Sequence, residues 1–258
     1  MIDIIKKDER NSKTPLLTVL LSFFNDKDTL KDSIQSVLNQ SFRDFELILL
    51  DDGSTDGSKK IAKEFMSKKE NILYLESKIN HGLTKMLNLG VQNSRGRYIA
   101  RQDADDMSLK TRFSKQIDFL KKNSEIDILG TNAKYFDGNK NFIVFMPNKD
   151  SEIKSGLKKK NTLIHPSVMI KSEILKKYKY DESFIRCQDY ELWLRIKNHV
   201  SFHNIQEDLI IYNYKDKKYT FKELMLTSKA RFKHISFFIS LYYLIEDFIR
   251  FIFKKSFS

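Results

Sequence analysis

Short apolar runs alternate with stretches of helical periodicity from residue 16 to about residue 130. Four of these runs are rich in Leu, Ile, Val and aromatic residues and are typical of buried strands: 16–23, 45–51, 71–76 and 97–102. Between them, apolar residues recur three or four positions apart, as on one face of a helix over 28–40. Strands that alternate with helices predict an α/β fold with a mostly parallel central sheet flanked by helices.

The pattern is less regular beyond residue 130. It predicts a Lys-rich helix or loop near 150–160 and a helix that begins near Gln188. Shorter apolar runs predict strands near 126–130, 132–136, 142–146, 166–170 and 208–214.

The stretch 235–253 is almost entirely apolar, but three ionised side chains interrupt it: Glu246, Asp247 and Arg250. Each would cost about 2.5–3.5 kcal/mol near the centre of a bilayer, so a membrane span is not expected. As a helix the stretch has a narrow polar stripe formed by Ser236, Ser240, Tyr243, Asp247, Arg250 and Lys254. Its broad apolar face must be buried on the rest of the chain, on a second copy in a homodimer, or in an anionic membrane surface.

The net charge of +12 over 258 residues is concentrated in two segments. Residues 154–179 carry eight lysines against one glutamate, and residues 213–258 carry ten Lys or Arg against four acids. The rest of the chain is close to neutral and shows no zinc-finger, RNP-like or basic-heptad pattern, so we expect no nucleic-acid binding. Anionic lipid headgroups or phosphorylated substrates suit two local cationic segments better.

The single cysteine, Cys187, excludes an internal disulfide and favours a reducing compartment. Residues 1–14 are charged throughout and show no apolar core of a secretory signal. We therefore expect a cytoplasmic protein.

Polar clusters directly follow three of the predicted strands: Ser22 to Asp26, Asp51 to Gly57, and Asp103 to Asp106. In an open α/β sheet, ligands bind outside the carboxyl ends of the strands, so these clusters should converge on one crevice. Asp103 and Asp105 can together hold a hard cation such as Mg²⁺ or Mn²⁺. The alternative for this pair is a solvated turn, and the alternative for Asp51 is an Asx turn followed by a helix cap.

Several other phosphate and cation sites are excluded by missing residues. The chain has no G-x-G-x-x-G after the first strand and no G-x-x-x-x-G-K-[ST], which argues against a nicotinamide cofactor or a P-loop. An EF-hand is excluded because no glycine follows the third acidic position. A phosphatase of the Asp-x-Asp type is a weaker alternative, since Arg101 and Gln102 replace its apolar lead-in and Met107 follows the acidic cluster.

The sequence resembles the family 2 glycosyltransferases, inverting enzymes of the GT-A nucleotide-diphospho-sugar transferase fold, and especially those that build bacterial lipopolysaccharide, capsule and exopolysaccharide. The matching segments occur in the family's order: Ser22–Asn25, Ser36–Phe42, Phe45–Leu47, Asp51–Asp56, Asn80–Leu83, Leu87–Asn88, Gly96–Asp106, His165–Met169 and Gln188–Arg195. The resemblance covers about residues 15–215.

The resemblance implies a GT-A catalytic domain over 15–215, with a nucleotide-sugar-binding half (15–106) and an acceptor-binding half (107–215). Residues 1–14 are then an N-terminal extension, and residues 216–258 a basic, amphipathic helical tail.

The resemblance also implies roles for individual residues. Asp52 would accept a hydrogen bond from the uracil of a UDP-sugar, and Asp105, with Asp103, would bind Mn²⁺ or Mg²⁺. Asp189 would be the catalytic base, with His165 and Gln188 on the acceptor side, and Lys215 would replace a basic residue that contacts the diphosphate. The implied nucleotide-sugar site comprises Ser22, Phe24, Asn25, Asp51, Asp52, Asn80, Gly82, Asn88, Arg101, Asp103, Ala104 and Asp105.

Some of these residues also have purely structural interpretations. Asp189 is a plausible N-cap for a helix over 190–197, and His165 could serve as a structural hydrogen-bonding group. Trp193, the only tryptophan, is expected in the core rather than against a sugar.

The function implied by the resemblance is transfer of a hexose or N-acetylhexosamine from a UDP-sugar to a hydroxyl of a lipid-linked glycan acceptor. The enzyme would work at the inner face of the cytoplasmic membrane. A catalytically inactive nucleotide- or carbohydrate-binding module is the main alternative, and the set of Asp52, Asp103, Asp105 and Asp189 argues against it.

Overall fold

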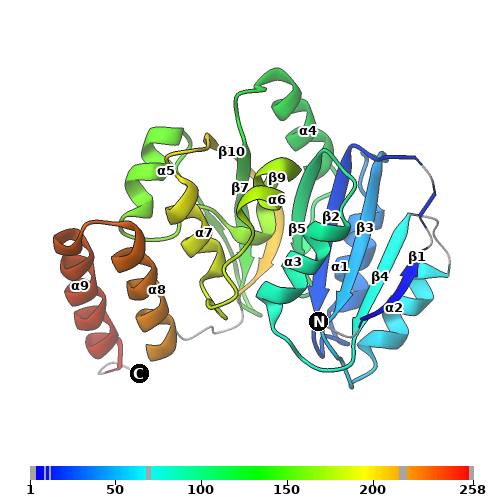
Figure 1. Cartoon of the computed structure of the whole chain (residues 1–258), viewed down its shortest axis with the longest axis horizontal. Helices are drawn as coiled ribbons and strands as arrows, with labels where there is room; N and C mark the ends of the chain where they lie inside the picture. The colour runs from blue at the N-terminus through cyan, green and yellow to red at the C-terminus, as the bar shows by residue number, and fades with distance from the viewer. Residues whose placement is uncertain (1–3, 9, 12, 68–70, 215–219, 256–258) are drawn as a thin grey trace.

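The computed structural model describes residues 4–8, 10–11, 13–67, 71–214 and 220–255 (Figure 1). Strands form a central twisted sheet with helices on both faces, and two further helices extend the molecule at one end (Figure 1). The α/β class predicted from the sequence is confirmed.

The strands of the sheet follow the order β1-β4-β3-β2-β5-β9-β7-β10-β6, and β8 pairs with β7. Their bounds are β1 Ile4–Asp8, β2 Leu17–Phe23, β3 Phe45–Asp51, β4 Ile72–Ser77, β5 Tyr98–Asp103, β6 Met107–Ser108, β7 Ile128–Phe136, β8 Asn141–Val144, β9 Met169–Lys171 and β10 Phe202–Asn213. Neighbouring strands among β4, β3, β2 and β5 are parallel, and so are β7 and β10. Because β9 is antiparallel to both β5 and β7, the carboxyl ends of β2, β3, β5, β7 and β10 share one edge.

The helices cover the sheet through two separate apolar cores. Their bounds are α1 Leu30–Leu38, α2 Ser58–Met66, α3 Leu83–Asn93, α4 Arg112–Lys122, α5 Asp150–Leu157, the 3₁₀ turn His165–Ser167, α6 Ser172–Tyr178, α7 Gln188–Ile196, α8 Phe221–His234 and α9 Phe237–Lys255. Side chains of α1, α2 and α4 pack on one face, and those of α3, α6 and α7 pack on the other. Buried strands such as β2 contribute alternate residues to both cores, which explains their uninterrupted apolar sequence.

Three local predictions differ from the structure. The two strands expected over 126–136 form one continuous strand, β7. The strand expected over 166–170 is displaced, because Pro166 lies in a 3₁₀ turn and only Met169–Lys171 pair with neighbours. Within the expected N-terminal extension, Ile4–Asp8 form an edge strand antiparallel to β4.

The C-terminal tail is helical, as predicted, and consists of α8 and α9. α9 lies at the outer end of the molecule, with α8 between it and α7 (Figure 1). Within the part of the chain that the structure describes, no helix combines the length and the apolar content needed to cross a membrane.

A close backbone approach at Gly96 generates a prediction about stability. A Cβ atom there would lie 2.5 Å from the Thr18 nitrogen and 2.7 Å from the Leu17 carbonyl carbon, both in β2. Gly96→Ala should therefore lower the free energy of unfolding by about 3 kcal/mol, because backbone atoms must move apart. Gly138→Ala is the control: its positive φ of 99° costs about 1 kcal/mol, but no atom lies within 4 Å. Urea denaturation measures both, and equal losses would contradict the steric explanation.

Candidate active site

Three carboxylates meet where β5 ends. Asp103, Asp105 and Asp106 each offer an oxygen, and these oxygens lie within 4.8 Å of one another. Asp103 and Asp105 are partly exposed, whereas Asp106 is buried and accepts a hydrogen bond from the Asn213 amide at 2.8 Å. A close set of carboxylate oxygens suits a hard divalent cation such as Mn²⁺ or Mg²⁺. The residues present thus fit the cation that the sequence resemblance implies.

A buried polar network holds the backbone of this acidic turn. The side-chain nitrogen Nε2 of Gln102 donates to the backbone carbonyls of Asp103 (3.2 Å) and Asp106 (2.8 Å). The Ser33 hydroxyl also donates to the Asp103 carbonyl (2.7 Å). The Arg112 guanidinium in turn donates to the Gln102 side-chain oxygen at 3.2 Å. Burial lowers the pKa of Arg112 to about 9, so it remains charged at neutral pH. The turn is fixed through its carbonyls, which leaves the Asp103 and Asp105 carboxylates facing the crevice.

Charges around the turn are only partly balanced. The buried Arg101 guanidinium forms an ion pair with the Asp103 carboxylate. Burial, together with the charges of Asp105, Asp56 and Asp103, raises the pKa of Asp26, which follows β2. An excess of negative charge therefore remains where a cation would sit.

The loop after β3 places Asp51 in a structural role. Its Oδ1 accepts a hydrogen bond from the Ser54 amide at 2.8 Å, so it holds the turn. The amide is three residues on rather than the two of the Asx turn considered as its alternative, and the cap of α2 is Gly57. Its Oδ2 accepts a hydrogen bond from the Tyr74 hydroxyl at 2.7 Å. Burial and the Asp51 carboxylate raise the pKa of Tyr74, so the phenol stays protonated. Asp51 is fully buried, and its two hydrogen bonds hold the loop in place.

Asp52 ties this loop to the start of α3. Its two carboxylate oxygens accept hydrogen bonds from the amides of His81 (2.7 Å) and Gly82 (2.8 Å), and only 3% of the residue is exposed. Burial raises the pKa of Asp52, and these two hydrogen bonds oppose the shift. A carboxylate oxygen has a second lone pair, so both contacts are compatible with an additional donor. Contact with a base remains a prediction.

The segment after β2 forms the neighbouring wall. Asn25 has a left-handed backbone (φ 58°), and its side-chain oxygen accepts a hydrogen bond from the Thr55 amide at 2.8 Å. Ser22 is buried at the end of β2, whereas Phe24 is 43% exposed. Asn80 is also exposed, next to the amides that hold Asp52. These residues surround the carboxyl ends of β2 and β3, as the sequence predicted for their segments.

Asp189 lies in the first turn of α7 and is not its N-cap. The helix begins at Gln188, and the capping position is Cys187, which has a left-handed backbone (φ 57°). The predicted cap is wrong by two residues, because Cys187 takes the capping position and the helix starts directly after it. The Asp189 Oδ2 accepts a hydrogen bond from the Asn161 side chain at 2.6 Å. A partly exposed carboxylate held by one neutral donor keeps capacity to accept a proton.

His165 links the two halves of the crevice. Its Nε2 is 2.9 Å from the Tyr180 hydroxyl, and burial lowers the pKa of His165, so the ring is neutral at pH 7. The charges that act on His165 include those of Asp189, Arg101 and Asp103. Asp189 and Asp103 also act on the partly buried Tyr212, where burial is the main cause of a raised pKa. The acidic turn and Asp189 thus both lie near His165 and Tyr212.

Other residues predicted for the site serve the fold. The Asn88 side chain donates to the Tyr180 carbonyl (3.0 Å) and accepts from the Tyr180 amide (2.9 Å), so its polar groups anchor the 180 segment on α3. Ala104 packs in the core, Gln188 is buried in α7, and Trp193 is fully buried as expected. Lys215 lies outside the described residues.

The sequence indicated the acidic cluster but missed several of its partners. Asn161 contacts Asp189 from a loop 28 residues earlier, and Asp26 and Asp106 contribute charge beside the predicted pair. Asp106 and Asp26 belong to the polar clusters that follow the predicted strands, so the sequence already indicated their position near the site. No local pattern marks Asn161 or Tyr212, because tertiary packing alone brings them to the crevice.

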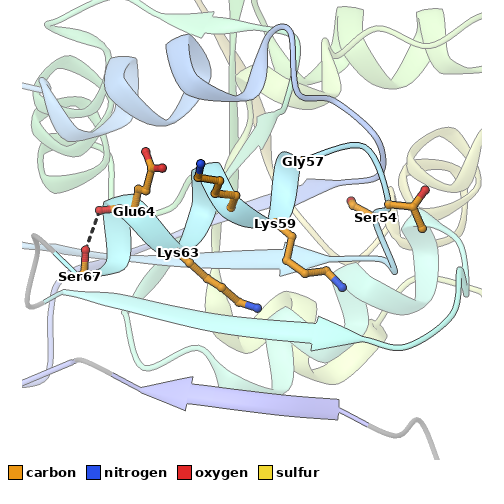
Figure 2. A pocket seen from close by; sticks show the side chains of 8 residues that line it. Ser54, Gly57, Lys59, Lys63, Glu64 and Ser67 are labelled. Atoms are coloured by element: carbon orange, nitrogen blue, oxygen red, sulfur yellow. Dashed lines mark hydrogen bonds between the residues drawn. The ribbon is translucent and has the colours of Figure 1, made fainter.

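A separate open hollow lies over α2 (Figure 2). Its lining includes Ser54, Gly57, Lys59 and Lys63, and the two lysines form ion pairs with Glu76 at 2.8 and 3.0 Å. The lysines thus balance a carboxylate of β4, and the acidic turn does not contribute to this surface.

Comparisons with known proteins agree with this architecture. Residues 18–179, more than half of the chain, match the family described as Glycosyl transferase family 2. The chain is 39% identical over 204 residues to an uncharacterized glycosyltransferase, MJ1057, of Methanocaldococcus jannaschii, covering 77% of this chain and 70% of that protein. It is 30% identical over 209 residues to the O-antigen biosynthesis glycosyltransferase WbnJ of Escherichia coli, covering 78% and 81%.

Solved structures of low sequence identity share the fold. S. aureus TarS 1-349 in complex with UDP superposes with a TM-score of 0.65 at 16% identity, over 83% of this chain and 64% of that one. The mannosyltransferase PcManGT of Pyrobaculum calidifontis, in complex with GDP-Man and Mn²⁺, superposes with a TM-score of 0.61 at 12% identity, over 91% and 66%. The GT-A fold is confirmed, and the chain belongs to glycosyltransferase family 2.

Proposed function

We propose that the chain transfers a hexose or N-acetylhexosamine from a UDP-sugar to a hydroxyl of a glycan acceptor, with inversion at the anomeric carbon. The observation that carries the proposal is the cluster of carboxylates in the acidic turn, with Asp189 close enough to act on the same side chains, His165 and Tyr212. An Asp-x-Asp phosphatase is inconsistent with membership of family 2. An inactive binding module would have no need of a base opposite the acidic turn.

The residues can be assigned to two sides of a single displacement. Asp103 and Asp105 would hold Mn²⁺ or Mg²⁺, which supplies positive charge that stabilises the departing diphosphate. On the other side, Asp189 accepts the proton of the acceptor hydroxyl as its oxygen attacks the anomeric carbon. The bond to the UDP oxygen breaks as the new bond forms on the opposite face, so an α-linked donor gives a β-linked product.

Asn161 and the donor pocket complete the assignment. The hydrogen bond from Asn161 orients the Asp189 carboxylate, which makes Asn161 a positioning residue. Asp52, with the wall from Ser22 to Asn25, would receive the nucleotide. Neighbouring structures contain UDP or GDP-Man, so a panel of UDP-sugars and GDP-mannose tests the nucleotide preference.

The acceptor and location belong to the proposal as well. WbnJ acts in O-antigen biosynthesis, which supports a surface polysaccharide as the product and a lipid-linked glycan as the acceptor. The enzyme would work on the cytoplasmic side of the membrane, where nucleotide sugars are made.

Removing a carboxylate of the acidic turn should abolish metal-dependent catalysis. Asp105→Asn should lower Mn²⁺-dependent UDP release at least about 100-fold, because the site loses an anionic ligand. Asp118→Asn, on the exposed side of α4, is the matched control and should retain wild-type activity. Equal wild-type turnover in EDTA and in Mn²⁺ would contradict the assignment.

The base should be separable from donor binding. Asp189→Asn should lower kcat by a factor of about 1000 while UDP affinity stays unchanged, because only proton transfer is lost. Asn161→Ala should lower kcat less and also spare UDP affinity. Calorimetry with UDP and a transfer assay measure the two quantities, and an active Asp189→Asn enzyme would remove this residue from the role.

Asp26 offers a readout that does not depend on activity. In EDTA at pH 7, Asp26→Asn should raise the free energy of unfolding, because the wild-type carboxylate ionises less readily in the folded state than in the unfolded one. The gain should shrink as the pH falls through the folded-state pKa, where the wild-type residue also becomes neutral. It should shrink at pH 7 in Mg²⁺, because a bound cation offsets the repulsion.

Asp56→Asn is a control that should change the free energy of unfolding in the opposite direction when measured by urea denaturation at pH 7. Burial alone would raise the pKa of Asp56, but hydrogen bonds from Ser58 and Lys27 outweigh this effect and lower it. Its replacement should therefore destabilise the protein at pH 7. A destabilised Asp26→Asn variant in EDTA would show that the repulsion is unimportant.

A further inference from the structure

Several polar side chains of α9 face the protein. Ser240 is fully buried against α8, and the Asp247 carboxylate accepts a hydrogen bond from Arg231 of α8 at 2.7 Å. Glu246 forms an ion pair with Lys159, beyond the end of α5, at 2.8 Å. Three members of the predicted polar stripe, Ser240, Tyr243 and Asp247, therefore face the protein, whereas Ser236 and Arg250 are exposed. A surface helix of a globular protein normally buries its apolar side instead.

The outward face of α9 is apolar along its length. Phe238, Tyr242, Ile245 and Ile249 follow one another at spacings of 4, 3 and 4 residues, and their exposed fractions are 81%, 64%, 53% and 48%. Phe237 and Phe248, at 62% and 45%, broaden the same surface. We call these six residues the α9 face. Within the described ranges of the chain, nothing else covers it, so its apolar area remains in water unless a partner binds.

Lysines lie beside α9. The Lys159–Glu246 ion pair brings the cationic segment 154–179 beside the cationic segment 213–258. Lys158 and Lys160 are exposed on either side of Lys159 in the sequence, and exposed Lys222 follows Phe221, whose ring contacts that of Phe251 in α9. An apolar helix face bordered by lysines has the composition of a helix that lies in the headgroup region of an anionic bilayer.

The charge distribution argues against a second copy as the partner. A twofold dimer through the α9 face would place the same surface patch of each subunit against its equivalent. Both cationic segments would then face their own copies, and like charges brought together across an interface repel. An anionic lipid surface instead complements both the apolar residues and the lysines.

We infer that the α9 face seats this enzyme on an anionic lipid bilayer, with Phe238 and Tyr242 entering the headgroup region and the flanking lysines meeting the lipid phosphates. The inference does not depend on the transferase chemistry. The helices α8 and α9 form a hairpin that packs against α7, which bears Asp189. Arg231 of α8 contacts the Tyr190 hydroxyl at 3.2 Å, and Nε2 of His234 in α8 lies 2.8 Å from the Glu191 carboxylate. Docking would therefore fix the orientation of the crevice relative to the membrane.

Vesicle cosedimentation of the full chain tests this inference. We expect binding to vesicles of equal parts phosphatidylcholine and phosphatidylglycerol, weaker binding in high salt, and little binding to pure phosphatidylcholine. The double variant Phe238→Ser/Tyr242→Ser should weaken binding about tenfold or more, because two exposed rings no longer leave water on docking. Phe145→Ser is the matched control, since Phe145 is 70% exposed outside the α9 face.

Insertion can be observed directly with Phe238→Trp. The native tryptophan, Trp193, is fully buried and out of reach of lipid, so quenching by brominated phosphatidylglycerol would report on position 238 alone. Circular dichroism establishes that each variant is folded, which exposed positions should allow. Unquenched fluorescence, equal binding of the double variant and wild type, or a wild-type dimer that the double variant converts to monomer without any vesicle binding would each overturn the inference.

Discussion

The crowding of carboxylates at one edge of the sheet is the constraint on which the rest of the structure depends. The parallel arrangement delivers Asp26, Asp52 and the acidic turn to the same edge, and like charges at such distances repel. The Arg101 guanidinium offsets part of this repulsion at Asp103. Gln102 and Ser33 hold the turn by its carbonyl oxygens, and Arg112 supports Gln102 from within the core. These hydrogen bonds use the backbone carbonyls, so the turn is held without neutralising its carboxylates.

The opposite side of the crevice is assembled from distant parts of the chain. α7 carries Asp189, the loop beyond α5 supplies Asn161, and the α8–α9 hairpin braces α7 through Glu191 and Arg231. Buried Glu191 accepts from both His234 and Arg195, so the brace is polar and directional. The tail thus packs directly on the helix that bears Asp189. The ion pair between Lys159 and Glu246 brings together two charged segments that are far apart in the sequence.

The sequence predicted those features that depend on local patterns. Alternating apolar runs located β2 to β5, and the polar clusters after them located the acidic turn, because strand direction determines where the clusters meet. Prediction failed where nonlocal packing decided the outcome. Two strands expected over 126–136 became one because β10 pairs with β7 along its whole length. The predicted start of α7 near Gln188 is confirmed, but the capping position is Cys187 and not Asp189. The apolar pattern of α9 could not reveal which side faced the protein.

The union of two loops at Asp52 has a consequence for ligand binding. Gly53 packs against the backbone of Ile79, where a Cβ atom would lie 2.8 Å from the carbonyl carbon, and the Asp52 carboxylate spans the same junction. Close backbone packing and two hydrogen bonds thus hold the two loops together as one wall. Binding of the proposed nucleotide against this wall should therefore cost little conformational entropy. The wall should also select its base by a fixed shape rather than adjust to several bases. Acceptance of different donor sugars would then be decided at the other end of the proposed site, where the sugar binds.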